Sequence, residues 1–124
     1  MKKLAFHRSV LLALQGIAHG ISKERNLKIQ LLIGIIVIII SLLLKIARVE
    51  FIIILFVCFF VITLELLNTA LEKLIDKKYP DYDKDVGRIK DILAGVVLLA
   101  VILSVITGII ILTGPVIDFF KTTF

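Results

Sequence analysis

Three long apolar runs, at residues 27–47, 51–71 and 92–112, constrain the fold of this chain more than any other feature. A helix rises about 1.5 Å per residue, so each run has roughly the 20 residues needed to cross ~30 Å of hydrocarbon. Backbone polar groups in lipid must be satisfied within the protein, and three strands cannot close a barrel. The sequence therefore predicts an all-α membrane protein with three transmembrane helices.

The composition supports one membrane domain over residues 1–124. The chain is 60% hydrophobic, and a soluble domain of 124 residues has no interior large enough for that content. Its net charge of +5 comes from blocks between the apolar runs and not from one basic face. We therefore expect no nucleic-acid partner.

The basic residues predict the orientation in the membrane. Six lie before the first run, six lie between the second and third runs, and three lie on the opposite side. In that order they are Lys2, Lys3, Arg8, Lys23, Arg25 and Lys28; Lys73, Lys77, Lys78, Lys84, Arg88 and Lys90; Lys45, Arg48 and Lys121. One side of the membrane thus has twelve basic residues and the other has three. Because basic residues are more frequent on the cytoplasmic side, the N-terminus is predicted in the cytoplasm and the C-terminus, after Gly114-Pro115, outside.

Residues 4–21 predict a basic amphipathic helix at the cytoplasmic interface. Leucine, alanine and isoleucine recur there at helical spacing, and basic and amide side chains interrupt them. The simplest alternative is an anchor with no further role.

The second run carries a polar stripe. At about 100° per residue, Glu65, Asn68, Glu72 and Asp76 share a sector of roughly 80°. Glu65 lies about 9 Å inside the end of the run, where a carboxylate is costly. The acids could form salt bridges with Lys90 or Arg88, or Glu65 could be protonated and hydrogen-bonded within the bundle. Alternatively, the deep acid is a general base and the shallower acids hold a divalent cation.

Two further segments bring charged groups to the membrane depth of the shallower acids of the stripe. Lys90 and Asp91 precede the third run, where small residues allow close helix approach, and Glu24 precedes the first run. No Gly-rich phosphate-binding motif and no protein-kinase motif occurs in the sequence. The residues alone therefore indicate an acid cluster at the membrane face that can bind a cation.

At these residues the chain resembles the prokaryotic diacylglycerol kinase family, which includes the undecaprenol kinases. The resemblance is carried by ELLNTALEKLID at residues 65–76, Lys90-Asp91, Ala94-Gly95, ERNLK at residues 24–28 and ALQG at residues 13–16. It covers residues 16–112. The chain departs from the family pattern in three ways: Pro80 follows Tyr79, Leu11 stands where an arginine is common, and the loop is more acidic than expected, with Asp81, Asp83 and Asp85.

The resemblance implies a homotrimeric lipid kinase in the bacterial cell membrane. It implies Mg²⁺, ATP as the phosphate donor, and undecaprenol or diacylglycerol as the acceptor. Glu65 would be the base at the lipid hydroxyl, with Asn68 orienting it. Glu24 and Glu72 would hold the Mg²⁺–ATP, and Lys90 and Asp91 would contact the nucleotide.

Two other classes of function were considered: a non-catalytic membrane subunit, and a cation or proton transport element. A transport path needs polar groups through the full depth of the bilayer. The outer halves of the three runs are nearly featureless, with only Ser104 and Thr107 in the third. This pattern favours an enzyme over a transporter.

Overall fold

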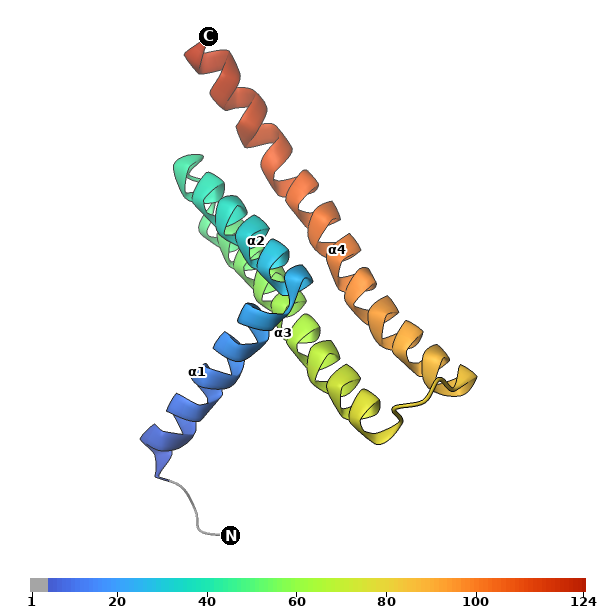
Figure 1. Cartoon of the computed structure of the whole chain (residues 1–124). Helices are drawn as coiled ribbons and strands as arrows, with labels where there is room; N and C mark the ends of the chain where they lie inside the picture. Colours follow the sequence, from blue (N-terminus) through green and yellow to red (C-terminus); the bar gives the residue numbers. More distant parts are fainter. Residues whose placement is uncertain (1–4) are drawn as a thin grey trace.

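The computed structural model describes residues 5–124, which form four helices (Figure 1). Their bounds are α1, Phe6–Lys23; α2, Arg25–Leu43; α3, Arg48–Lys78; and α4, Lys84–Thr123. Lys2 and Lys3, which enter the charge count, and Leu4, where the first helix was predicted to begin, lie outside the described residues. Within residues 5–124 no strand is present, so the all-α prediction is confirmed.

Helices α2, α3 and α4 are each long and apolar enough to cross a membrane. The central helix of the three is α3, which packs against both α2 and α4 (Figure 1). The buried side chains include Ile54, Val57 and Val61 of α3 and Val97 and Ala100 of α4. Most other Ile, Leu and Phe side chains point outward, as expected when lipid is the solvent.

The first two spans differ from their predicted ends. The first was predicted to reach Ala47, but α2 ends at Leu43. The turn to α3 contains Lys45 in a left-handed conformation, with φ of 51°, which stops the helix before its apolar run is finished. In contrast, α3 continues past the predicted end of the second span to Lys78. The whole polar stripe therefore lies on one continuous helix.

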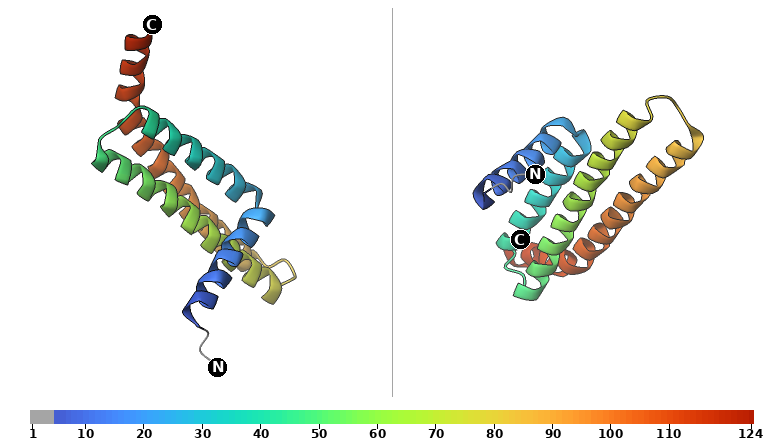
Figure 2. Two further views of the ribbon diagram at one scale, coloured as in Figure 1. Left: turned by 90° about the vertical axis from the view of Figure 1, so that its left-hand side faces the viewer. Right: turned by 90° about the horizontal axis from the view of Figure 1, so that it is seen from below.

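Helix α4 extends beyond the predicted third span, which ended at residue 112, and continues through Pro115 to Thr123. Proline has no N–H, so it cannot donate to the carbonyl of residue 111, and such a gap bends a helix without always ending it. Figure 2 shows the C-terminal part of α4 turning away from the rest of that helix. Apolar residues after Pro115, such as Val116 and Ile117, extend the apolar character of α4 beyond the predicted span.

Helix α1 leaves the other three at an angle (Figures 1 and 2). It ends where Glu24 adopts an extended conformation, with φ of −106° and ψ of 118°, so Glu24 alone separates α1 from α2. Gly20 is the buried residue of α1. A Cβ atom at Gly20 would lie 2.8 Å from Leu66 Cδ2, which shows how closely α1 approaches α3. The predicted N-terminal helix is thus present, and its position at the membrane interface stays a prediction.

Candidate functional site

Glu65 lies on the central helix and is 6% exposed. Gln30 of α2 donates a hydrogen bond from Nε2 to Glu65 Oε2 over 3.2 Å. The hydrogen bond in the alternative of a protonated, hydrogen-bonded Glu65 is thus present, and the protonation stays a prediction. Sequence reasoning missed Gln30, although it is the only polar side chain between Lys28 and Ser41 in the first apolar run.

Asn68 lies one turn from Glu65 on the same helix. Its Oδ1 atom is buried and has no hydrogen-bond partner in the described part of the chain, and the same is true of Gln30 Oε1. Buried acceptors without a donor are rare and cost stability. Around the carboxyl group of Glu65, the protein therefore provides acceptor oxygens that a ligand with an O–H or N–H group could satisfy.

Glu24 sits at the junction of α1 and α2 and pairs with Lys73 of α3, with Oε1 and Nζ 3.5 Å apart. This contact brings Glu24 beside the helix turn that carries Glu72, its predicted partner at the cation. Both side chains of the pair remain partly open to solvent, with 50% of Lys73 and 35% of Glu24 exposed.

Lys90, near the start of α4, donates from Nζ to Asp76 Oδ1 over 2.9 Å. This hydrogen bond and the charge of Asp76 raise the pKa of Lys90, and the charge of Glu72 adds a smaller contribution in the same direction. Lys90 precedes the apolar part of α4, contacts Asp76, and lies near enough to Glu72 for that charge to affect its pKa. The expectation of an interhelical salt bridge is confirmed for Asp76 with Lys90.

Two other charged residues near this end make no contact with the stripe in the described structure. Asp91 is exposed on the first turns of α4. Arg88 pairs instead with Asp85 of its own helix, at 3.6 Å. Asp83 caps α4 by accepting hydrogen bonds from the backbone N–H groups of Asp85 and Val86, at 2.8 and 3.1 Å. The acidic loop before α4 therefore has a structural role, because such a cap stabilises a helix by about 1 kcal/mol.

The predicted metal ligands were tested against the geometry. Residues 5–124 contain no group of three or more His, Cys, Asp or Glu side chains that could hold a metal ion. Mg²⁺ usually takes one or two protein carboxylates and completes its shell with water and substrate phosphates. Glu24 and Glu72 fit that requirement in number and ligand type.

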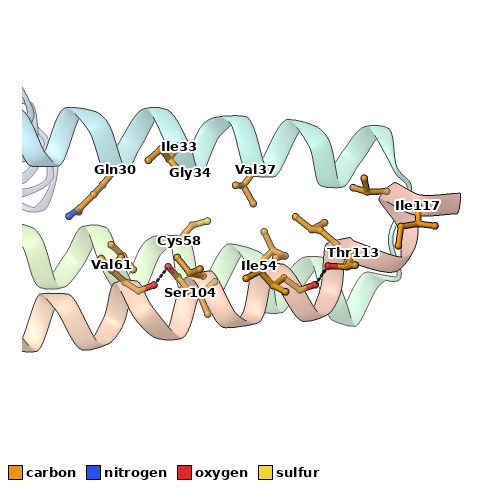
Figure 3. A pocket seen from close by; sticks show the side chains of 17 residues that line it. Gln30, Ile33, Gly34, Val37, Ile54, Cys58, Val61, Ser104, Thr113 and Ile117 are labelled. Atoms are coloured by element: carbon orange, nitrogen blue, oxygen red, sulfur yellow. Dashed lines mark hydrogen bonds between the residues drawn. The ribbon is translucent and has the colours of Figure 1, made fainter. Parts of the chain in front are cut away.

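An apolar groove of about 550 Å³ runs between α2, α3 and α4 (Figure 3). Gln30 lies at one end of it and Ile117 at the other. The hydroxyl groups of Ser104 and Thr113 donate to carbonyls of their own helix. Most of the other side chains that line the groove are apolar.

Comparison with known proteins was made for the whole chain. A sequence model of the family described as prokaryotic diacylglycerol kinase matches residues 11–112, which include every candidate site residue from Glu24 to Asp91. A protein from Synechocystis sp. described as "Diacylglycerol kinase" is 34% identical over 104 residues. The alignment covers 83% of this chain and 59% of the relative. The chain therefore spans less than two thirds of that relative's length.

Proposed function

Because this chain belongs to the prokaryotic diacylglycerol kinase family, we propose that it transfers the γ-phosphoryl group of ATP to the hydroxyl of a membrane lipid. The observation that carries the proposal is the arrangement of α3. This helix holds a buried acid, Glu65, and about 10 Å further along the same face a more exposed acid, Glu72. The two depths match an acceptor that is buried in lipid and a donor that comes from water.

Glu65 is the proposed general base. Its carboxylate accepts the proton of the lipid hydroxyl, the hydroxyl oxygen forms a bond to the γ-phosphorus, and the bond from that phosphorus to the β–γ bridging oxygen breaks. The products are a phosphorylated lipid and ADP. Asn68, one turn away with an unpartnered Oδ1, orients the acceptor. General-base catalysis typically contributes about 10²–10⁴-fold to such a reaction.

Glu24, Glu72, Lys90 and Asp91 form the proposed donor side. Glu24 and Glu72 would hold Mg²⁺, which when bound supplies charge neutralisation for the phosphates. Lys90 is cationic at physiological pH, as an ordinary lysine is, and Asp76 and Glu72 raise its pKa further. Asp91 follows Lys90 on an exposed turn, where it can reach the nucleotide from the water side.

The existing ion pairs are compatible with nucleotide binding. Exposed or partly exposed pairs such as Lys73–Glu24 typically contribute only about 0–1 kcal/mol. Lys73 can therefore exchange the Glu24 carboxylate for a nucleotide phosphate at little cost. In the same way, Lys90 would leave Asp76 and bind a nucleotide phosphate.

Two acceptors fit the site, diacylglycerol and undecaprenol, because each carries one primary hydroxyl on a long hydrocarbon body. The test uses purified full-length protein in mixed micelles with labelled ATP, Mg²⁺ and either lipid, followed by lipid extraction. We expect label in the lipid phase with at least one of the two, and the ratio of kcat/KM values identifies the acceptor. No label in either lipid, from protein that binds ATP, would contradict the proposal.

We also propose that the enzyme is a homotrimer in the bacterial cell membrane. The supporting argument is that a single chain offers only two of the oxygen ligands of a cation and leaves Asp91 without a partner in the described residues. Sites shared between subunits would be completed by a neighbour. Mixing Glu65→Gln with Glu24→Gln should then restore part of the activity. Failure to complement in proven hetero-oligomers would place each site within one chain.

A further inference from the structure

Gln30 contacts Glu65, but the proposed function assigns no role to its side-chain amide. It reaches from α2 to α3, and its Nε2 atom lies 3.2 Å from Glu65 Oε2. The contact links two helices at the depth of the buried acid. Among residues 5–124 a second side-chain hydrogen bond between helices runs from Lys90 to Asp76, at the exposed end of the stripe.

The contact distinguishes the two oxygens of Glu65. Rotation about the last side-chain bond of a glutamate is broad, so a free carboxylate has no fixed plane. Gln30 holds Oε2, and in the described part of the chain Oε1 accepts no hydrogen bond. The carboxylate is thereby oriented with one oxygen fixed and the other available to accept a proton.

The orientation of the Gln30 amide follows from the same contact. Its NH₂ group must face the carboxylate, since the amide oxygen would be repelled there. Gln30 Oε1 therefore points elsewhere, and it is buried without a donor among residues 5–124. A purely structural glutamine in an apolar bundle would be expected to satisfy both ends of its amide. An incomplete amide beside an oriented acid fits a site that a hydroxyl-bearing ligand completes.

We propose that Gln30 is a positioning residue for phosphoryl transfer: it fixes the carboxylate of Glu65 so that Oε1 faces the hydroxyl of the acceptor lipid. The proposal rests on the proposed lipid kinase function. Gln30 itself exchanges no proton with the substrate in this account. Gln30 acts by orienting Glu65. Its loss should therefore lower turnover and leave nucleotide affinity unchanged.

The main test compares Gln30→Met with the wild type in the full-length protein. Methionine keeps a similar length and shape but cannot donate. We expect kcat for lipid phosphorylation to fall at least tenfold, while KM for ATP stays within twofold. Ser41→Ala is the matched control, because it removes a buried hydroxyl from the same helix whose hydrogen bond goes to Val37 O within α2. Its kcat should stay within twofold of wild type.

A double-mutant cycle separates positioning from stability. In the Glu65→Gln background, Gln30→Met should lower the residual turnover by less than twofold, because there is no longer a base to orient. The exchange variant Gln30→Glu with Glu65→Gln keeps a hydrogen bond between the helices but moves the acid to α2. We expect it to retain thermal stability and to stay as inactive as Glu65→Gln.

Gln30→Asn covers the case in which Gln30→Met does not fold. Asparagine remains an amide but is one methylene too short to reach Glu65, so kcat should again fall at least tenfold. Wild-type turnover in Gln30→Asn or Gln30→Met would overturn the proposal. So would a result in which Gln30→Met lowers turnover by the same factor in the wild type and in the Glu65→Gln background. If the wild-type protein labels neither lipid, the proposed function fails first, and that result is distinct from an active wild type with active Gln30 variants.

Discussion

Lys90 and Asp76 join α4 to α3 through a 2.9 Å hydrogen bond, at the end of the helix face that also carries Glu65 and Glu72. Both partners are partly exposed, with side-chain exposures of 36% and 62%. Such a solvent-exposed pair contributes little to stability. Its two members should therefore differ in their effects on function if Lys90 binds nucleotide.

The first prediction compares Lys90→Met with Asp76→Asn. We expect Lys90→Met to raise KM for ATP at least tenfold, because a cation near the phosphates is lost. Asp76→Asn should change KM for ATP less than threefold and should lower the thermal midpoint only slightly. Steady-state kinetics over a range of ATP concentrations measures both. Equal effects of the two substitutions would mean that the ion pair acts only as a structural link.

The second prediction concerns the cation. Glu72→Gln should reduce turnover at ordinary Mg²⁺ by at least tenfold, and higher Mg²⁺ should recover part of it, because one oxygen ligand has been weakened. Asp118→Asn is the control, since Asp118 is an exposed acid near the other end of α4. Titration of activity against Mg²⁺ checks the result. Normal turnover and an unchanged Mg²⁺ dependence in Glu72→Gln would show that Glu72 is only a charge at the end of the helix.

The third prediction tests how α1 is held. Gly20→Ala places a Cβ atom 2.8 Å from Leu66 Cδ2, next to Glu65, whereas nothing lies within 4 Å of a Cβ at Gly114. Alanine favours a helix by up to about 1 kcal/mol over glycine at both positions. We therefore expect Gly114→Ala to be neutral or stabilising and Gly20→Ala to be less favourable. Thermal unfolding of the purified proteins provides the comparison.

The contact itself is tested with Leu66→Ala as the second substitution. In that background the penalty of Gly20→Ala should disappear, because the side chain that it displaces is absent. An equal penalty in both backgrounds would show that α1 does not pack on Leu66.

The fourth prediction concerns orientation. With twelve basic residues before the first run and between the second and third runs, against three on the opposite side, the C-terminus should be outside. A reporter that is active only outside the cytoplasm, fused after Phe124, should be active. A second reporter, active only in the cytoplasm and fused at the same place, is the control. Activity of the cytoplasmic reporter would contradict the orientation and the cytoplasmic position of Glu24 and Glu72.

The three long helices could be predicted from the sequence because length and apolar composition determine them almost alone. Their ends could not. The left-handed residue Lys45 ended α2 before its apolar run was finished, and α4 continued through Pro115 to Thr123, beyond the predicted span. Asp83 looked like a departure in an acidic loop, and its role as a cap became visible only in the backbone hydrogen bonds.

For the candidate site, periodicity correctly placed the stripe of α3 on one face, because one helix carries all of it. Contacts between helices were harder to predict. The pairing of Asp76 with Lys90 was among the alternatives, whereas that of Glu24 with Lys73 was not foreseen. Gln30 was missed because one amide in a long apolar run carries no periodic signal, and its partner is 35 residues away. The catalytic and metal-binding roles stay predictions.

The most direct measurement of the central claim is nucleotide binding and lipid phosphorylation on one preparation of Glu65→Gln. Glu65 lies deeper than the groups proposed to hold Mg²⁺–ATP, so its amide variant should bind Mg²⁺–ATP within about threefold of wild type. Its turnover should fall by at least the ~10²-fold typical of a lost general base. A folded variant that loses ATP affinity but retains near-normal turnover at saturating ATP would contradict the account.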